Sequence, residues 1–214
     1  MPKTSFGHTD HYDVYQFIKM EIFRNDKLIG YNNYFFSRDK DVLLVKNQLK
    51  FTVSLFGSDV FNIEGYGEEK YKKNKLVLFK SKTIQNNKEK FVKITYNANS
   101  KKFDIKGSSY NGEADIHNVV GNWWNHQVLS ANSQISPISG SVKKQVVTFI
   151  GKETIKLYGK TFETEHFKLQ SKNMTLPKDK RLDFDIWYDK KNAIILKVSY
   201  SRMGNWEYRL KNFN

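Results

Sequence analysis

The five histidines are the side chains in this sequence best suited to metal binding, because the chain contains no cysteine. A zinc site would have to combine carboxylates with some of these histidines, which are His8, His11, His117, His126 and His166. No two of them have the His-Glu-x-x-His spacing that places two ligands on one face of a helix. We therefore predict no metal site and no cofactor.

His166 and Asp185 are the best candidates for acid–base chemistry. A histidine beside a carboxylate can act as a general base, and these two side chains would meet if the extended segments 161–170 and 182–189 are neighbours. Glu165 precedes His166 directly, so on a strand it points to the opposite face. A structural hydrogen bond between histidine and carboxylate is the commoner outcome, and we assign no catalytic residue. If the protein is an enzyme, the candidates are His126, His166 and Asp185.

The best binding candidate is the cluster around Trp123 and Trp124. Adjacent tryptophans combine a large apolar area with N–H donors, which suits the mouth of a barrel or a membrane interface. Core packing of Trp124 alone would explain part of the cluster. Trp187 falls on an otherwise charged strand face, so it needs cover from this cluster or from a ligand. The predicted ligand-binding residues are Trp123, Trp124, His126, His166, Trp187 and Tyr188.

Two glycine motifs lack the context of a phosphate-binding loop. The sequence Gly151-Lys152-Glu153-Thr154 has no upstream glycine, and no helix follows Gly65-Tyr66-Gly67. We predict that these glycines occupy turns or bulges.

The elements that must position these residues are strands. From His11 onward the chain alternates short extended segments with polar turns such as Asn25-Asp26-Lys27 and Asn86-Asn87-Lys88, which is typical of β-hairpins. Several segments are apolar on both faces, which indicates a sheet that curls around something. We predict an all-β antiparallel meander curled into an open or closed β-barrel. One short helical element near residues 119–130 would serve as a plug or lid.

Loop lengths predict the register of the last three strands, whereas two registers fit the first hairpin. A three-residue loop at 190–192 would place Ile186 opposite Leu196, and Asp185 opposite Lys197. A three-residue loop at 202–204, with glycine at the position that needs positive φ, would place Tyr200 opposite Trp206 and Val198 opposite Tyr208. This register puts the apolar residues on one face, so the meander would be half-buried.

Length and composition suit one domain. The 214 residues include 39% hydrophobic and 15% aromatic residues, too many for a disordered chain. We predict a flexible N-terminal segment at 1–10 and a single β-barrel-like domain at 11–214. The longest apolar runs are a few residues, against the roughly 18 needed to span a bilayer, so no segment is expected to cross a membrane.

The formal net charge of +14 results from 36 Lys+Arg against 22 Asp+Glu. Nucleic-acid sites favour the bidentate guanidinium group, but only five of the basic residues are arginines: Arg24, Arg38, Arg181, Arg202 and Arg209. We therefore predict no nucleic-acid partner. We also predict that the protein is a monomer. The charge is compatible with an anionic membrane surface or an acidic ligand headgroup.

Several short motifs resemble a family of exported proteobacterial proteins known only as a domain of unknown function. They include Leu28-Ile29-Gly30-Tyr31, Trp123-Trp124-Asn125 and Asp185-Ile186-Trp187-Tyr188-Asp189, and the resemblance extends over nearly the whole chain. It implies a sheet wrapped into an open barrel, similar in outline to lipoprotein carriers and other periplasmic half-barrels. It also implies a location in the periplasm, although no signal segment is evident and the cytoplasm stays open. No catalytic residues follow from it.

Three functions fit these observations. The first is a non-enzymatic periplasmic protein that holds an apolar or lipid-like ligand in its curled sheet. The second is an isomerase or hydrolase on a barrel scaffold, acting on a hydrophobic substrate, which predicts a solvent-shielded histidine with a shifted pKa. The third is a structural or assembly role in the envelope, which a filled interior without a cavity would favour.

Overall fold

In the computed structural model, which describes residues 9–214, tight turns with left-handed backbone separate the strands. Asn25 and Asp26 have φ of 48° and 61°, and Asn86 and Asn87 have φ of 45° and 63°. Asparagine and aspartate tolerate this region better than other residues with a Cβ, and two in succession make a turn that matches the twist of the flanking strands. These turns therefore form hairpins, as the sequence predicts.

Residues 9–214 form fifteen strands and three short 3₁₀ helices. The first eight strands are β1 (Phe17–Arg24), β2 (Lys27–Asp39), β3 (Val42–Leu55), β4 (Ser58–Lys72), β5 (Lys75–Gln85), β6 (Lys88–Asn97), β7 (Lys102–Gly107) and β8 (Asn111–Asp115). The others are β9 (Val119–Val120), β10 (Ser133–Ile135), β11 (Val142–Leu157), β12 (Lys160–Ser171), β13 (Asp183–Asp189), β14 (Ile194–Ser201) and β15 (Asn205–Phe213). The helices are η1 (Thr9–Tyr12), η2 (His126–Leu129) and η3 (Lys178–Lys180).

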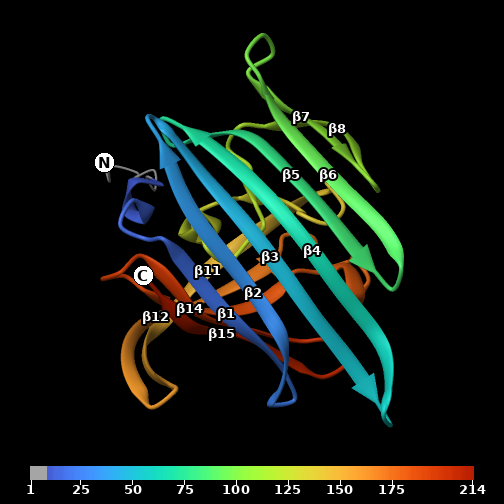
Figure 1. Cartoon of the computed structure of the whole chain (residues 1–214), viewed down its shortest axis with the longest axis vertical. Coiled ribbons are helices and arrows are strands. Elements are labelled where there is room, and N and C mark those ends of the chain that lie inside the picture. Colours follow the sequence, from blue (N-terminus) through green and yellow to red (C-terminus); the bar gives the residue numbers. More distant parts are fainter. Residues whose placement is uncertain (1–8) are drawn as a thin grey trace.

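All fifteen strands belong to one sheet, in the order β8-β7-β6-β5-β4-β3-β2-β1-β15-β14-β13-β12-β11-β10-β9. Neighbours are antiparallel except β9 and β10. The first and last strands pair with each other, so the described chain begins and ends in the middle of the sheet (Figure 1). The sheet ends at β8 and β9, so it is curled and not closed. The prediction of an all-β, barrel-like meander is confirmed.

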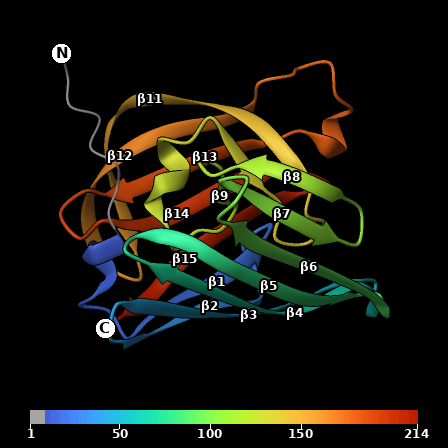
Figure 2. The same ribbon diagram turned by 90° about the horizontal axis from the view of Figure 1, so that it is seen from above.

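The curl brings the two halves of the sheet face to face. Figure 2 shows β2–β5 on one side and β11–β13 on the other, with β9 and the short helix after it between them. This helix is η2, so the predicted helical element near residues 119–130 is present. Its neighbour Trp124 is fully buried against Tyr12, Phe36 and Tyr71. The segment from β9 to η2, residues 119–129, therefore fills part of the interior, and we call it the crossing segment.

The C-terminal strands confirm one predicted register and correct the other. Tyr200 pairs with Trp206 across the 202–204 turn, as predicted. In the preceding hairpin, however, Asp189 pairs with Ile194, so its loop has one residue more than predicted. A bulge between Trp187 and Tyr188 adds a second shift.

As a result Asp185 lies opposite Ser199, and Lys197 lies opposite Trp187. The loop is longer because Ala193 adopts a left-handed φ of 52° and the Asp189 carboxylate accepts hydrogen bonds from the N–H groups of Lys191 and Asn192. Beyond the bulge the total shift is two residues, so the side chains from Asp185 to Trp187 keep their predicted faces. In the first hairpin, Ile18 pairs with Tyr34.

The prediction for the two glycine motifs is right for one and wrong for the other. Gly151 follows a bulge after Phe149 in β11, as predicted. Gly65 and Gly67 lie in regularly paired positions of β4, so their prediction as turn or bulge residues is wrong.

The predicted flexible segment 1–10 falls largely outside the described residues, as does His8. Within residues 9–214, no helix has the length and apolar character required to span a bilayer.

Candidate functional site

A cavity of about 480 Å³ lies on the concave side of the sheet. Inward side chains of β2–β5 line one side of it, and Trp123 with aromatic residues of β13–β15 lines the other. Buried residues such as Thr83 share this lining with exposed ones such as Lys178, so the cavity opens to solvent. The interior is thus filled around Trp124 and hollow next to it.

The two glycines of β4 create the hollow. Across the sheet, Gly65 lies between Leu49 and Thr83, and Gly67 lies between Asn47 and Ser81. Apart from Leu49, these rows consist of glycine and short polar residues, which leave volume that larger side chains would occupy. A Cβ added to Gly67 would lie 3.4 Å from the Cβ of Asn47, which is ordinary contact. Side chains are therefore sterically possible at this position and would project into the cavity.

An aromatic wall faces these rows. Trp123 contacts Phe184 edge-on at 5.1 Å between ring centroids, and Phe184 contacts Tyr200 in the same way at 5.3 Å. Tyr208 completes the wall beside Trp123 at 6.2 Å. Such edge-to-face pairs fix the rings relative to one another and offer an apolar surface to a ligand.

Glu69 forms the polar end of the cavity. This side chain is 2% exposed, and burial raises its pKa to about 7. Its carboxylate accepts hydrogen bonds from the Tyr71 hydroxyl at 2.6 Å, the Asn122 amide at 2.8 Å and the Trp124 indole N–H at 2.8 Å. Because Asn122 and Trp124 belong to the crossing segment, Glu69 ties this segment to β4.

A second polar group lies beside Glu69. The Asn47 amide donates to the Asn32 Oδ1 at 2.7 Å, and the Asn32 amide donates to the Tyr34 hydroxyl at 2.8 Å. The Trp123 backbone N–H donates to the same hydroxyl at 3.2 Å. In residues 9–214, every buried side-chain nitrogen or oxygen atom has a hydrogen-bond partner. The polar lining is therefore held in place without a ligand.

The structure separates the predicted binding residues into four places. Trp123 lines the cavity, whereas Trp124 belongs to the core. His126 and Tyr188 pack against each other outside the cavity at 5.5 Å. The Nδ1 atom of His126 is 2.7 Å from the Tyr12 hydroxyl, and burial lowers the histidine pKa to about 4. This histidine is half-buried, and it does not line the cavity.

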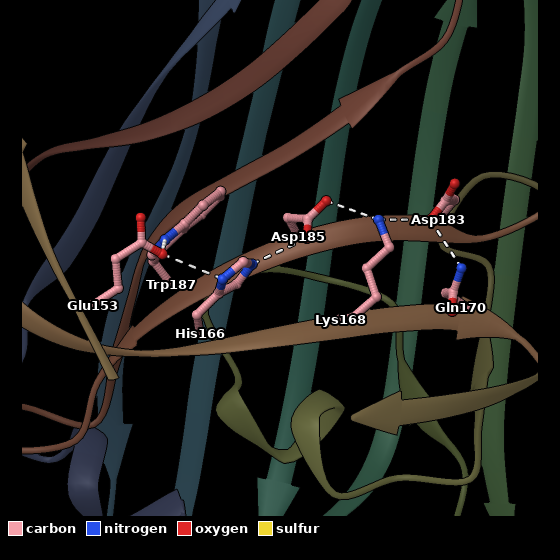
Figure 3. Close-up of polar contacts among 7 residues, drawn as sticks. All are labelled: Glu153, His166, Lys168, Gln170, Asp183, Asp185 and Trp187. Atoms are coloured by element: carbon pink, nitrogen blue, oxygen red, sulfur yellow. Dashed lines mark hydrogen bonds and ion pairs between the residues drawn. The ribbon is translucent and has the colours of Figure 1, made fainter. Parts of the chain in front are cut away.

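His166, Asp185 and Trp187 lie on the opposite face of the sheet, away from the cavity. Figure 3 shows them in a row of polar side chains from β11, β12 and β13. The two ring nitrogens of His166 lie 3.0 Å from Asp185 and 3.2 Å from Glu153. Strands β12 and β13 are neighbours, as predicted, and His166 therefore lies next to Asp185.

Trp187 receives its cover from this row. Its ring stacks on His166 at 4.6 Å, the Lys197 ammonium lies 4.6 Å from its centroid, and its indole N–H donates to Glu153 at 2.8 Å. Lys168 continues the row by bridging Asp183 and Asp185, both at 2.8 Å. Within residues 9–214 no cluster of histidine and carboxylate side chains could hold a metal ion. This outer row is an ion-pair network.

Comparison with known proteins identifies the family. A family model described as "Domain of unknown function (DUF6134)" matches residues 20–211. The chain belongs to this family. A crystal structure of a β-barrel-like protein of domain of unknown function DUF1849 from Brucella abortus is similar, with a TM-score of 0.63 and 8% identity over 94% of this chain and 97% of that one. At that identity the likeness shows the fold alone. No curated protein matches the sequence.

Apart from Trp123, the cavity residues of this DUF6134 domain were missed from the sequence. Glu69 stands between Glu68 and Lys70, a pattern typical of a solvated surface. The available signal was its alternation with Gly65, Gly67 and Tyr71, which places it on the inward face of β4. Glu153 was missed because only the pairing of β11 with β12 brings it to His166.

Proposed function

We propose that this DUF6134 protein is a non-enzymatic periplasmic protein that binds or carries an apolar or lipid-like ligand in its curled sheet. The observation that carries this proposal is the cavity of about 480 Å³, a size within the range of roughly 300–1,000 Å³ for small-molecule sites. A filled interior would instead favour a purely structural role.

The lining supports a ligand that is mainly apolar. The aromatic wall of Trp123, Phe184, Tyr200 and Tyr208 would bury ligand surface, at about 25 cal/mol for each Å² of apolar area removed from water. Glu69 and the neighbouring amides would receive a polar group of the ligand at the inner end.

Neither histidine candidate supports the enzyme alternative. His126 lies outside the cavity lining, and His166 with Asp185 lies on the other face of the sheet.

The periplasmic location rests on the family resemblance of the sequence. Fractionation of the bacterium that encodes the protein tests it, and recovery in the cytoplasmic fraction alone would contradict it.

Native mass spectrometry with organic extraction tests ligand binding. Protein purified gently from the periplasm of a host is expected to carry a reproducible extra mass that extraction releases as one lipid or isoprenoid class. The variant Gly67→Phe should lose this mass, because its ring would fill the cavity.

The matched control is Gly151→Phe. Gly151 is also a strand glycine, it does not line the cavity, and a Cβ there would have no atom within 4 Å. This variant should keep the extra mass. A wild-type protein without added mass, or equal loading of both variants, would contradict the proposal and favour an assembly role.

A further inference from the structure

Four basic side chains surround the opening of the cavity, and we call them the cationic rim: Lys143, Lys178, Arg181 and Arg202. They come from β11, from η3 and the residue after it, and from the turn between β14 and β15. Lys178 and Arg202 are exposed, whereas Lys143 and Arg181 are half-buried. Three separate segments thus bring positive charge to one place.

The side chains of the cationic rim lack carboxylate partners among residues 9–214. None of its members forms an ion pair with a carboxylate of residues 9–214, although many other basic residues do, among them Lys168, Lys197 and Arg209. Two carboxylates line the same cavity. Asp183 is paired with Lys168 at 2.8 Å, and Glu69 is hydrogen-bonded at the inner end.

Hydrogen bonds to backbone carbonyls hold the rim together despite its charge. Arg202 donates to the carbonyl of Arg181 at 3.0 Å, and Lys143 donates to the carbonyl of Lys180 at 3.3 Å. Burial and the nearby Arg202 lower the pKa of Lys143. Gathering like charges costs free energy that an anion bound among them would offset.

Apolar residues adjoin the cationic rim inside the cavity. Leu182 follows Arg181 directly, and Phe184 and Tyr200 continue the lining toward Trp123. A molecule with an anionic end at the rim would therefore place its apolar part along the aromatic wall.

We propose that the cationic rim binds the anionic headgroup, a phosphate or a carboxylate, of an amphiphile whose apolar chain enters the cavity. This inference rests on the proposed function and names the class of ligand. Guanidinium groups suit both headgroups because they can donate two parallel hydrogen bonds to them.

Calorimetric titration with matched probes tests the inference. Dodecyl phosphate and laurate, kept below their micelle concentrations, should bind at least tenfold more tightly than dodecanol. The double variant Lys178→Gln/Arg202→Gln should lose this preference and keep its affinity for dodecanol. The control Lys46→Gln/Lys93→Gln removes two exposed lysines from outside the cavity lining and should bind as the wild type does.

A measurement on the wild type covers the case that the rim variant does not fold. Sodium chloride should weaken the binding of dodecyl phosphate and leave that of dodecanol unchanged, because salt screens charges at an open rim.

Equal affinity for dodecyl phosphate and dodecanol would overturn the rim inference and leave the cavity proposal standing. If none of the chain-bearing probes binds, the proposed function itself is overturned. If inorganic phosphate binds as tightly as dodecyl phosphate, the rim is a site for a free anion and not for an amphiphile.

Discussion

Glu69 is a carboxyl group inside an aromatic interior, and its neighbours are hydrogen-bond donors without positive charge. Three donors satisfy its oxygens, yet burial still raises its pKa to about 7. The neutral acid is therefore the form that the folded protein favours at pH values below neutrality. Its position at the inner end of the cavity means that its protonation state would also be sensed by a bound ligand.

The stability of the protein should depend on the protonation of Glu69. Between the unfolded pKa near 4.5 and the folded pKa near 7, the folded state holds a proton that the unfolded state has released. The stabilising contribution is complete below pH 4.5 and is lost as the pH rises through 7. One pKa unit corresponds to about 1.4 kcal/mol, so the loss is about 3 kcal/mol.

The variant Glu69→Gln mimics the neutral acid and should not show this loss. Urea unfolding at pH 5 and pH 7.5 measures it as the difference between wild type and variant. The difference is needed because His126, whose folded pKa of about 4 lies below its ordinary value, acts in the opposite direction between pH 4 and 6.5. Equal pH dependence of the two proteins would contradict the assignment of a raised pKa to Glu69.

At the scale of secondary-structure elements, the residue types in the turns determined which hairpins could be predicted from the sequence. The hairpins at Asn25-Asp26 and Asn86-Asn87 were predictable because these residue types favour left-handed backbone. The 202–204 turn was predictable because Gly204 supplies a φ of 120°. The 190–193 loop was not, because an alanine takes the left-handed position there.

The candidate site was less predictable than the strands. Trp123 and Trp124 lie in an irregular segment without periodicity, so the sequence pattern does not tell which of the two faces the cavity. Both were therefore predicted as ligand-binding residues. The position of His166 beside Asp185 followed from strand neighbours alone, whereas the cavity arises from side chains of strands far apart in the chain.

Asp189 determines the register of the β13–β14 hairpin. Its carboxylate accepts hydrogen bonds from the backbone N–H groups of Lys191 and Asn192 and from the Asn192 amide, and its side chain is buried. Replacement by alanine leaves these donors to water, so Asp189→Ala should destabilise the protein by about 1–3 kcal/mol. Chemical denaturation measures this cost.

The exposed Asp179 in η3 provides the control for this change. Asp179→Ala should change stability by less than about 0.5 kcal/mol, as surface substitutions generally do. If both variants lose the same stability, Asp189 does not hold the hairpin.

For the whole molecule, net charge is the property that governs encounters with surfaces. The charge of +14 is partly displayed on one wide sheet face, where exposed lysines include Lys46, Lys50, Lys80, Lys82 and Lys93. Such a face would attract an anionic membrane over distances set by the ionic strength.

Vesicle sedimentation tests this attraction. The protein should sediment with phosphatidylglycerol vesicles at 20 mM salt, release them at 300 mM salt and ignore phosphatidylcholine vesicles at both. Binding that persists at high salt would indicate insertion of apolar groups in place of surface attraction and would contradict the prediction.

The pairing of β1 with β15 has a consequence for how the protein folds. Within each half of the sheet, neighbouring strands follow one another in the sequence, so their pairing closes short loops. Strand β1 is different, since β2 lies on one side of it and β15, the last of the fifteen strands, lies on the other. Until β15 pairs with it, β1 keeps an open edge beside Met20 and Ile22, which are fully buried in the finished sheet. A partly folded chain is therefore most exposed to aggregation along this edge of β1.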